Sequence, residues 1–92
     1  MDYEWDAAKD RENRVKHGLA LADGIPALED PFAENWIDDR FDYGEERIVT
    51  LGLYQARVLF VVTTELMADR IRIISVRRAE KHEERRYYEG YP

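Results

Sequence analysis

A run of five apolar residues, Val58 to Val62, constrains the fold of this chain more than any other feature. β-branched and aromatic residues favour extended backbone, and successive side chains of a strand point to opposite faces of the sheet. A strand that is apolar on both faces is typical of the middle of a sheet rather than of its edge. The run therefore predicts that residues 57–64 form a central strand.

Three further segments have strand patterns: residues 32–37, 47–54 and 70–76. We expect the second to place alternate residues on one face, namely Arg47, Val49, Leu51 and Leu53. In the last segment, Ile71 and Ile73 face one way, and the other face carries Arg70, Arg72, Ile74 and Val76. Turns at residues 55–56 and 65–69 connect the strands, which predicts a small antiparallel sheet of about four strands. Residues 3–5 form either a short strand or a tethered arm.

Two helices are predicted before the sheet. Asp6 is a favourable N-cap for a very polar helix over residues 7–17, because its carboxylate can accept a hydrogen bond from an unpaired amide of the first turn. Gly18 follows in the position where helices often end in the left-handed conformation. The segment 19–28 suggests a second, shorter helix. Glycine and proline inside it predict a kink or a late start, at Gly24 and Pro26.

A third helix is predicted after the sheet, over residues 79–89, and it is poor in apolar side chains. With spacings of four residues, one helical face would carry Arg78, His82 and Arg86. The outline is that of one α+β domain over residues 1–92. We expect its two tryptophans, Trp5 and Trp36, to lie in the core.

The net charge of −6 hides an asymmetry between the two halves of the chain. Residues 1–46 hold fourteen acids against five bases, whereas residues 47–92 hold six acids against nine bases. Half of the fourteen lysines and arginines fall within residues 69–88, namely Arg70, Arg72, Arg77, Arg78, Lys81, Arg85 and Arg86. Such a basic region indicates an anionic partner such as RNA phosphate, although a solvated surface of mixed charge explains the same pattern.

The sequence lacks the features of several kinds of site. It has no cysteine, which excludes disulfides and thiolate metal sites. His17 and His82 lie in different predicted helices, and neither belongs to an HExxH motif. The acidic segment 38–46 lacks the pattern of a calcium loop, so a solvated loop is favoured over a metal-binding regulator. We expect neither a metal nor a cofactor.

The ends and apolar runs of the chain bear on its location. The first residues are charged throughout, which predicts that there is no signal peptide. The longest apolar run is too short to span a bilayer. We therefore expect a cytoplasmic protein that makes no contact with a membrane.

One chemistry fits a chain without metal or thiol ligands. RNA carries its own nucleophile, the 2′-hydroxyl, so its cleavage needs a base, an acid and cations that stabilise the phosphorane. Arginine suits the last role because its planar fork reaches two oxygens at once. The groups that could move protons are Glu65, His82, His17 and Tyr87. We regard His17 as a helix cap rather than a catalyst, with the helix dipole favouring its protonated form.

Residues along nearly the whole chain resemble the BrnT toxins of bacterial type II toxin–antitoxin systems. The order and spacing of short motifs carry the resemblance: Glu4-Trp5-Asp6, Lys16-His17-Gly18, Asp30-Pro31, Gly44-Glu45-Glu46-Arg47, the stretch from Arg70 to Ser75, and Tyr88-Glu89. Gly24 and Pro26 depart from the family, which has an uninterrupted second helix.

The resemblance implies a RelE-like ribonuclease fold and a toxin that cleaves RNA and inhibits translation. It implies a BrnA-like antitoxin as the partner in a hetero-oligomer, with promoter DNA bound only through the antitoxin. The implied catalytic set is Arg72, Arg77, Arg78, Arg86 and Glu65. Candidate substrate-binding residues are Arg47, Lys81, His82, Tyr87 and Tyr88.

One alternative to this function remains open in the sequence, because the candidate site residues could have structural roles. Arg72 could make a cross-strand ion pair, and the tyrosines could pack the helix to the sheet instead of stacking on bases. A non-catalytic module that binds a partner on the same scaffold would then explain the acidic balance of the protein.

Overall fold

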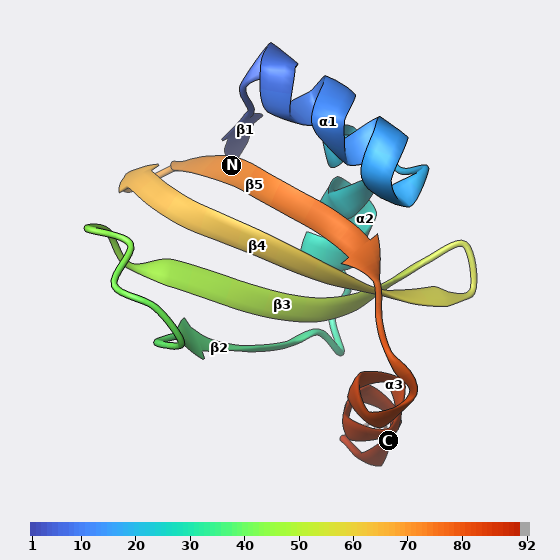
Figure 1. Ribbon diagram of the computed structural model, residues 1–92. Helices are drawn as coiled ribbons and strands as arrows, with labels where there is room; N and C mark the ends of the chain where they lie inside the picture. The colour runs from blue at the N-terminus through green and yellow to red at the C-terminus, as the bar shows by residue number, and fades with distance from the viewer. Residues whose placement is uncertain (91–92) are drawn as a thin grey trace.

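The computed structural model describes residues 1–90. Its elements, in chain order, are β1 (Asp2–Glu4), α1 (Ala7–His17), a 3-10 turn η1 (Leu21–Asp23), α2 (Gly24–Leu28), β2 (Glu34–Asp38), β3 (Arg47–Tyr54), β4 (Arg57–Met67), β5 (Arg70–Arg78) and α3 (Lys81–Glu89). Figure 1 shows the sheet lying between α1 and α3. The α+β class is confirmed. No helix in this part of the chain is long and apolar enough to cross a membrane.

The sheet has five strands in the order β1-β5-β4-β3-β2. The meander from β2 to β5 is antiparallel, as expected, but β1 pairs with β5 in parallel, with Tyr3 opposite Ile71. The sheet is therefore mixed, with one strand more than predicted. Three residues show too little alternation of apolar and polar side chains to distinguish a strand from an arm. The extended backbone of β1 depends mainly on its pairing with β5.

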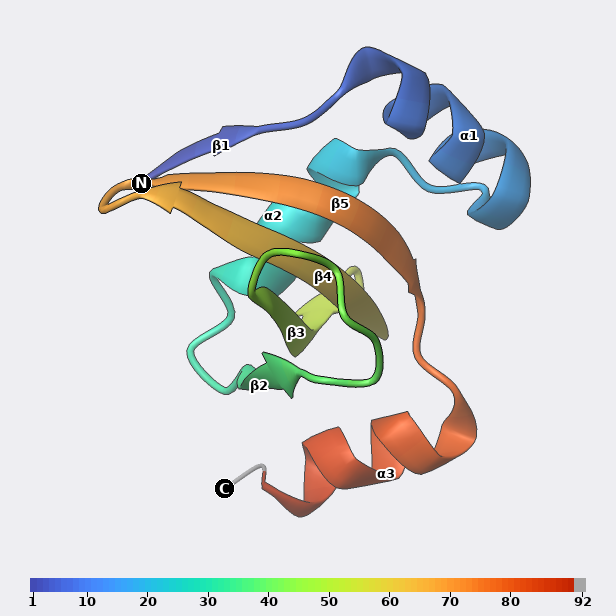
Figure 2. The ribbon, with the colours of Figure 1, turned by 60° about the vertical axis from the view of Figure 1, so that its left-hand side comes forward.

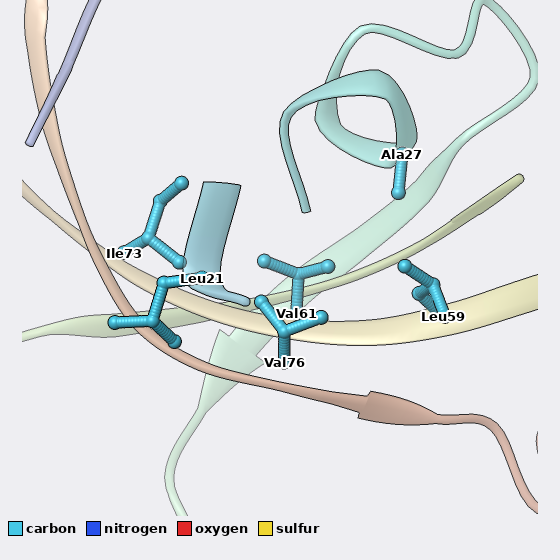
Figure 3. Close-up of a cluster of buried hydrophobic side chains, with 6 residues drawn as sticks. All are labelled: Leu21, Ala27, Leu59, Val61, Ile73 and Val76. Atoms are coloured by element: carbon cyan, nitrogen blue, oxygen red, sulfur yellow. The ribbon is translucent and has the colours of Figure 1, made fainter. Parts of the chain in front are cut away.

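Both faces of the sheet are covered, each by its own cluster of apolar side chains. On the face of α1 and α2 the buried residues are Leu21, Ala27, Leu59, Val61, Ile73 and Val76 (Figure 3). The opposite face holds Val49, Leu51, Val58, Phe60, Val62 and Tyr87, with Trp36 packed against them. This arrangement explains the apolar run of β4, whose residues alternate between two cores.

A bulge in β5 changes the predicted faces of its side chains. Val62 pairs with Ser75 and Thr63 with Ile73, so Ile74 is the extra residue. The prediction that Ile73 and Val76 face opposite ways is therefore wrong, because both lie in the core under α1 and α2. Ile74 packs against the other core.

The helix α1 closes the edge of β5 that β1 leaves open. Asn13 is 6% exposed, and its amide nitrogen donates to the carbonyl oxygens of Leu19, at 2.8 Å, and Val76, at 2.9 Å. Its side-chain oxygen accepts from the amide of Val76 at 3.0 Å. Asn13 thus pairs with an edge residue as a neighbouring strand would, and it fixes α1 beside β5.

On the opposite face, a few side chains of α3 hold this helix near the sheet through hydrogen bonds and ion pairs. The ring of Tyr87 is 1% exposed, and its hydroxyl donates to Asp30, whose carboxylate also accepts from the amide of Leu53 at 2.9 Å. Nearby, the guanidinium of Arg86 donates to Glu34 at 2.7 Å. The side chain of Tyr87 therefore anchors α3.

The acidic connection between β2 and β3 folds back over the same face (Figure 2). Arg40 makes two hydrogen bonds to the buried carboxylate of Asp38, at 2.8 and 2.9 Å, and its guanidinium lies 5.7 Å from the centre of the Phe60 ring. These bonds hold the pKa of Asp38 at about 2, well below its usual value. At the other end of the loop, the hydroxyl of Thr64 donates to the carbonyl oxygen of Glu46 at 2.8 Å.

Several element bounds differ from the predictions. The strand predicted over residues 32–37 is β2, Glu34–Asp38, and the last strand extends beyond residue 76 to Arg78. The strand β4 continues to Met67, so Glu65 lies inside a strand and not in the turn. The predicted late start of the second helix is confirmed, because η1 precedes a helix that begins at Gly24. The helix α3 begins at Lys81, which leaves Arg78 in β5 and off the predicted face with His82 and Arg86.

The predicted turn between β3 and β4 and the caps of α1 are confirmed. Gln55 and Ala56 both have positive φ, of 50° and 63°, as a two-residue hairpin loop requires. Asp6 accepts from the amide of Ala8 at 3.4 Å, and Gly18 ends the helix at φ 70°.

Candidate functional site

Two of the predicted arginines lie in one row that crosses the sheet. Arg72 pairs with Glu4 on one side and with Thr64 on the other, and Arg47 pairs with Asp38. Arg47 precedes Ile48, which is opposite Thr63 in an antiparallel pair, so the same register brings Arg47 beside Thr64. The strands are about 4.8 Å apart, so the backbones of Arg72 and Arg47 are separated by about 10 Å. Their side chains share the face of α3, since Arg47 alternates with the buried Val49 and Leu51.

Arg72 is oriented by the short strand β1. Its Nε and Nη2 atoms donate to Glu4 at 3.2 and 2.8 Å, while its side chain stays 48% exposed. The hydrogen bonds to Glu4 raise the pKa of Arg72, which keeps its positive charge. The cross-strand ion pair considered in the sequence is thus present, and it leaves one side of the guanidinium open to solvent.

Arg77 is the most tightly held of the predicted catalytic residues. Its two terminal nitrogens each donate to a different oxygen of Glu83, at 2.9 Å, and its guanidinium lies 3.8 Å from the centre of the Phe60 ring. The amide of Glu80 also donates to Glu83, at 2.7 Å. This network connects the end of β5 to the first turn of α3.

The pockets beside β5 adjoin one another and form a trough along this strand, between α1 and the sheet face. One end, a pocket of about 490 Å³, is lined by residues that include Trp5, Lys9, Arg47 and Arg72. The middle shares Lys9 and Arg47 with it, and adds side chains from α1 and β5. The far end is lined by Lys16, His17, Arg77, Arg78 and Glu80. We call this surface the β5 trough.

The β5 trough is cationic although the protein is acidic. Six lysines and arginines line it, namely Lys9, Lys16, Arg47, Arg72, Arg77 and Arg78, together with His17. The carboxylates along it are Asp6, Glu12, Glu45 and Glu80. Arg47 bonds to Glu45 at 3.4 Å and lies 3.9 Å from the centre of the Tyr43 ring. A chain of phosphates is a ligand whose charge this surface would complement.

The other predicted site residues lie outside the trough. Glu65 follows Thr64 and therefore points to the other face of the sheet, away from Arg72. Arg86 bonds to Glu34 and lies 4.0 Å from the centre of the Trp36 ring. Exposed side chains of α3 include Lys81, His82 and Tyr88, whereas Tyr87 is buried and cannot stack on a base.

Sequence reasoning missed the contribution of α1 to this surface. Lys9 and Lys16 line the trough because Asn13, which lies between them, faces β5. The spacing of these residues, four and three apart, places them on one side of a helix and was the available signal. Trp5 was expected in the core, but it is 37% exposed and lines the pocket that contains Arg72.

The pKa of His17 is shifted in the opposite direction to the one predicted. Burial lowers its pKa, and the charges of Lys16 and Arg77 lower it further, so the expected stabilisation of the protonated form by the helix dipole does not prevail. The imidazole is therefore neutral near pH 7 and can accept a proton. It lines both the far end of the trough, with Arg77 and Arg78, and the middle of the trough, with Arg47.

Within residues 1–90, one group of side chains could surround a metal ion, namely Glu80, His82 and Glu83. The oxygens of Glu83 already accept hydrogen bonds from Arg77 and from the amide of Glu80. The carboxylates of the acidic loop do not gather in this way, since Asp38 binds Arg40.

The protein is thus a small α+β domain whose sheet carries a row of arginines. The chain belongs to the BrnT family: the model for the ribonuclease toxin BrnT of type II toxin–antitoxin systems matches residues 5–83. The resemblance found in the sequence is therefore confirmed.

A crystal structure of the Brucella abortus ribonuclease toxin BrnT is similar to this chain, with a TM-score of 0.69 at 24% sequence identity. The match covers 88% of this chain and 99% of that one. At this identity the likeness shows the fold. A comparison with curated proteins found no match.

Proposed function

We propose that this protein is an endoribonuclease toxin that cleaves RNA without a metal ion, using the arginines of the β5 trough. The row that joins Arg72 and Arg47 across the sheet is the observation that carries the proposal. It presents two arginines on one face, with their backbones about 10 Å apart, on strands that position them more rigidly than loops would. Membership in the BrnT family supports the same reaction.

In this reaction the 2′-oxygen attacks the adjacent phosphorus, and the bond from phosphorus to the 5′-oxygen breaks. A base takes the proton of the 2′-hydroxyl, and an acid protonates the leaving oxygen. Arg72 would stabilise the additional negative charge of the phosphorane. Arg77, at the far end of the trough, would hold a more distant phosphate. Arg47, Lys9 and Lys16 would hold neighbouring phosphates.

Among the proton-moving groups suggested by the sequence, His17 is the one that lines the trough. Its lowered pKa suits a group that must be neutral before it accepts a proton. Tyr87 is buried, and Glu65 points to the other face. We therefore favour His17 as the base.

The test is cleavage of a single-stranded RNA by the purified protein in EDTA. Since one lost transition-state contact typically costs about 100-fold or more in rate, we expect Arg72→Ala to reduce cleavage by at least that factor. The matched control is Arg85→Ala, which removes an exposed arginine of α3 outside the trough. Undiminished cleavage by folded Arg72→Ala protein would refute the site, and activity that disappears in EDTA would refute metal independence.

We further propose that the toxin inhibits translation in the cytoplasm and is neutralised by a BrnA-like antitoxin in a hetero-oligomer. The antitoxin would be the part of the complex that reads promoter DNA. Growth arrest on expression of the toxin alone, relieved by co-expression of the antitoxin, is the expected result.

A second candidate function is a partner-binding module without catalysis. Its support is that each of the best-placed arginines already has a carboxylate partner in this chain: Arg47 with Glu45, Arg72 with Glu4 and Arg77 with Glu83. A harmless protein that binds the antitoxin but leaves RNA intact would favour this candidate.

A further inference from the structure

Among residues 1–90, the partly exposed ring of Trp5 belongs to neither of the two apolar cores. Trp5 is 37% exposed and belongs to neither apolar core, in contrast to Trp36, which packs beside Phe60. Aromatic rings usually bury their large apolar surface, so an exposed one in a pocket suggests a ligand. Among residues 1–90, Trp5 makes no ring contact and no cation–π contact, whereas the guanidinium of Arg86 covers the Trp36 ring at 4.0 Å.

The backbone on both sides of Trp5 is fixed. Glu4 precedes it in β1 and holds Arg72, and Asp6 follows it as the N-cap of α1. The ring is thus carried by a single residue between two ordered elements, and it needs little ordering before it binds.

The surroundings of Trp5 match one nucleotide of a nucleic acid strand. The pocket of about 490 Å³ places the indole in the same cavity as three cations, Lys9, Arg47 and Arg72. A nucleotide has a flat base, which stacks on an aromatic ring, attached through its sugar to phosphates that require cations. Ile73 and Ile74 supply further apolar lining.

We propose that Trp5 is a stacking platform for one unpaired base of a single-stranded RNA, at the end of the β5 trough next to Arg72. This inference rests on the proposed function and adds the form of its substrate. A base that is paired inside a duplex has its faces covered by its neighbours, so the pocket would select an unpaired or unstacked nucleotide. Stacking accepts every base, so Trp5 would position the strand without reading its sequence.

The experiment measures binding of a fluorescent 2′-O-methyl oligoribonucleotide, which lacks the nucleophile and is not cleaved. Because stacking on one base typically corresponds to about a 5- to 150-fold change in affinity, we expect Trp5→Ala to weaken binding by a factor in that range. Trp5→Phe keeps an aromatic face and should stay within about threefold of the original protein. Phe32→Ala is the matched control, because Phe32 is 42% exposed and lies outside the trough. The Phe32→Ala protein should bind the oligonucleotide as tightly as the original protein.

An oligonucleotide of the same length without bases separates stacking from an effect on the fold. It should bind the original protein and Trp5→Ala equally, because it offers no ring to stack on. Equal loss of both oligonucleotides, or no loss of either, would overturn the role of Trp5. If neither oligonucleotide binds Trp5→Ala more weakly, the proposed function still predicts that Arg72→Ala reduces cleavage. If the original protein binds no single-stranded RNA, both proposals fail.

Discussion

At the scale of single residues, polar side chains with several partners determine where the cations of the trough lie. Glu4 accepts two hydrogen bonds from Arg72 and contacts Arg70 at 3.7 Å, so one carboxylate orients two arginines at the start of β5. Asn13 bonds to two backbone groups of Val76 and thereby carries Lys9 and Lys16 to the same strand. Within residues 1–90, no buried side-chain nitrogen or oxygen lacks a hydrogen-bond partner.

Replacing Asn13 tests this arrangement. Asn13→Ala would leave the amide and carbonyl of Val76 and the carbonyl of Leu19 without their partner, and each buried unpaired group costs about 1–3 kcal/mol. We expect the free energy of unfolding in urea to fall by roughly 2–4 kcal/mol. Asn35→Ala, at an exposed position of β2, should change it by less than about 0.5 kcal/mol. Equal effects of the two substitutions would contradict the role of Asn13.

At the scale of elements, the two layers of helix are attached to the sheet in different ways. The helix α2 packs so closely on β3 that an added Cβ at Gly52 would lie 2.0 Å from the carbonyl oxygen of Ala27. The helix α3, by contrast, is held at its start by Arg77 with Glu83 and near its end by Tyr87 with Asp30. The helix α3 is therefore attached by polar contacts near its two ends, whereas α2 is attached by close packing of backbone on backbone.

The close contact of α2 gives a prediction for Gly52. A methyl group there meets backbone rather than a flexible side chain, so Gly52→Ala requires α2 to move. We expect a loss of roughly 2–4 kcal/mol in unfolding free energy, measured by chemical denaturation. Gly90→Ala is the control, because its nearest neighbour would be at 3.7 Å, and it should be close to neutral. A Gly52→Ala protein as stable as the original would contradict the close contact between α2 and β3.

At the scale of the whole molecule, the net charge of −6 and the proposed RNA substrate are compatible because charge is segregated. The cations line the trough beside β5, whereas five acids belong to the segment between Asp38 and Glu46. Long-range repulsion of RNA by the acidic surface is screened by salt, whereas contacts inside the trough act at short range.

The salt dependence of binding measures how many phosphates the trough neutralises. For single strands, the logarithm of the affinity falls by about 0.7 per neutralised phosphate for each tenfold rise in salt concentration. We expect Arg47→Ala to reduce this slope by about 0.7, because it removes one such contact. Arg11→Ala, on the outer side of α1, should leave the slope unchanged. Titration of a 2′-O-methyl oligonucleotide at several salt concentrations supplies the slopes, and identical slopes for both variants would contradict the assignment of Arg47.

Much of the fold could be predicted because its signals are local. The alternation of β3 from Arg47 to Leu53, the two-residue turn after Tyr54 and the caps of α1 are properties of neighbouring residues, and the structure has them as predicted. The partner of β1 and the bulge at Ile74 could not be predicted, because both depend on which strand lies alongside.

The candidate site likewise has features that could be predicted from the sequence and features that depend on the tertiary structure. The sequence by itself determined that positive charge collects around β5, since seven lysines and arginines fall within residues 69–88. Only the tertiary structure decided which of them share a surface: it brought Arg47, Lys9, Lys16 and Trp5 to Arg72, and it separated Glu65 and Tyr87 from that surface. The physical reason is that the charge of a segment depends on its residues alone. Which side chains meet on one surface depends on strand register and on the packing of helices far away in the chain.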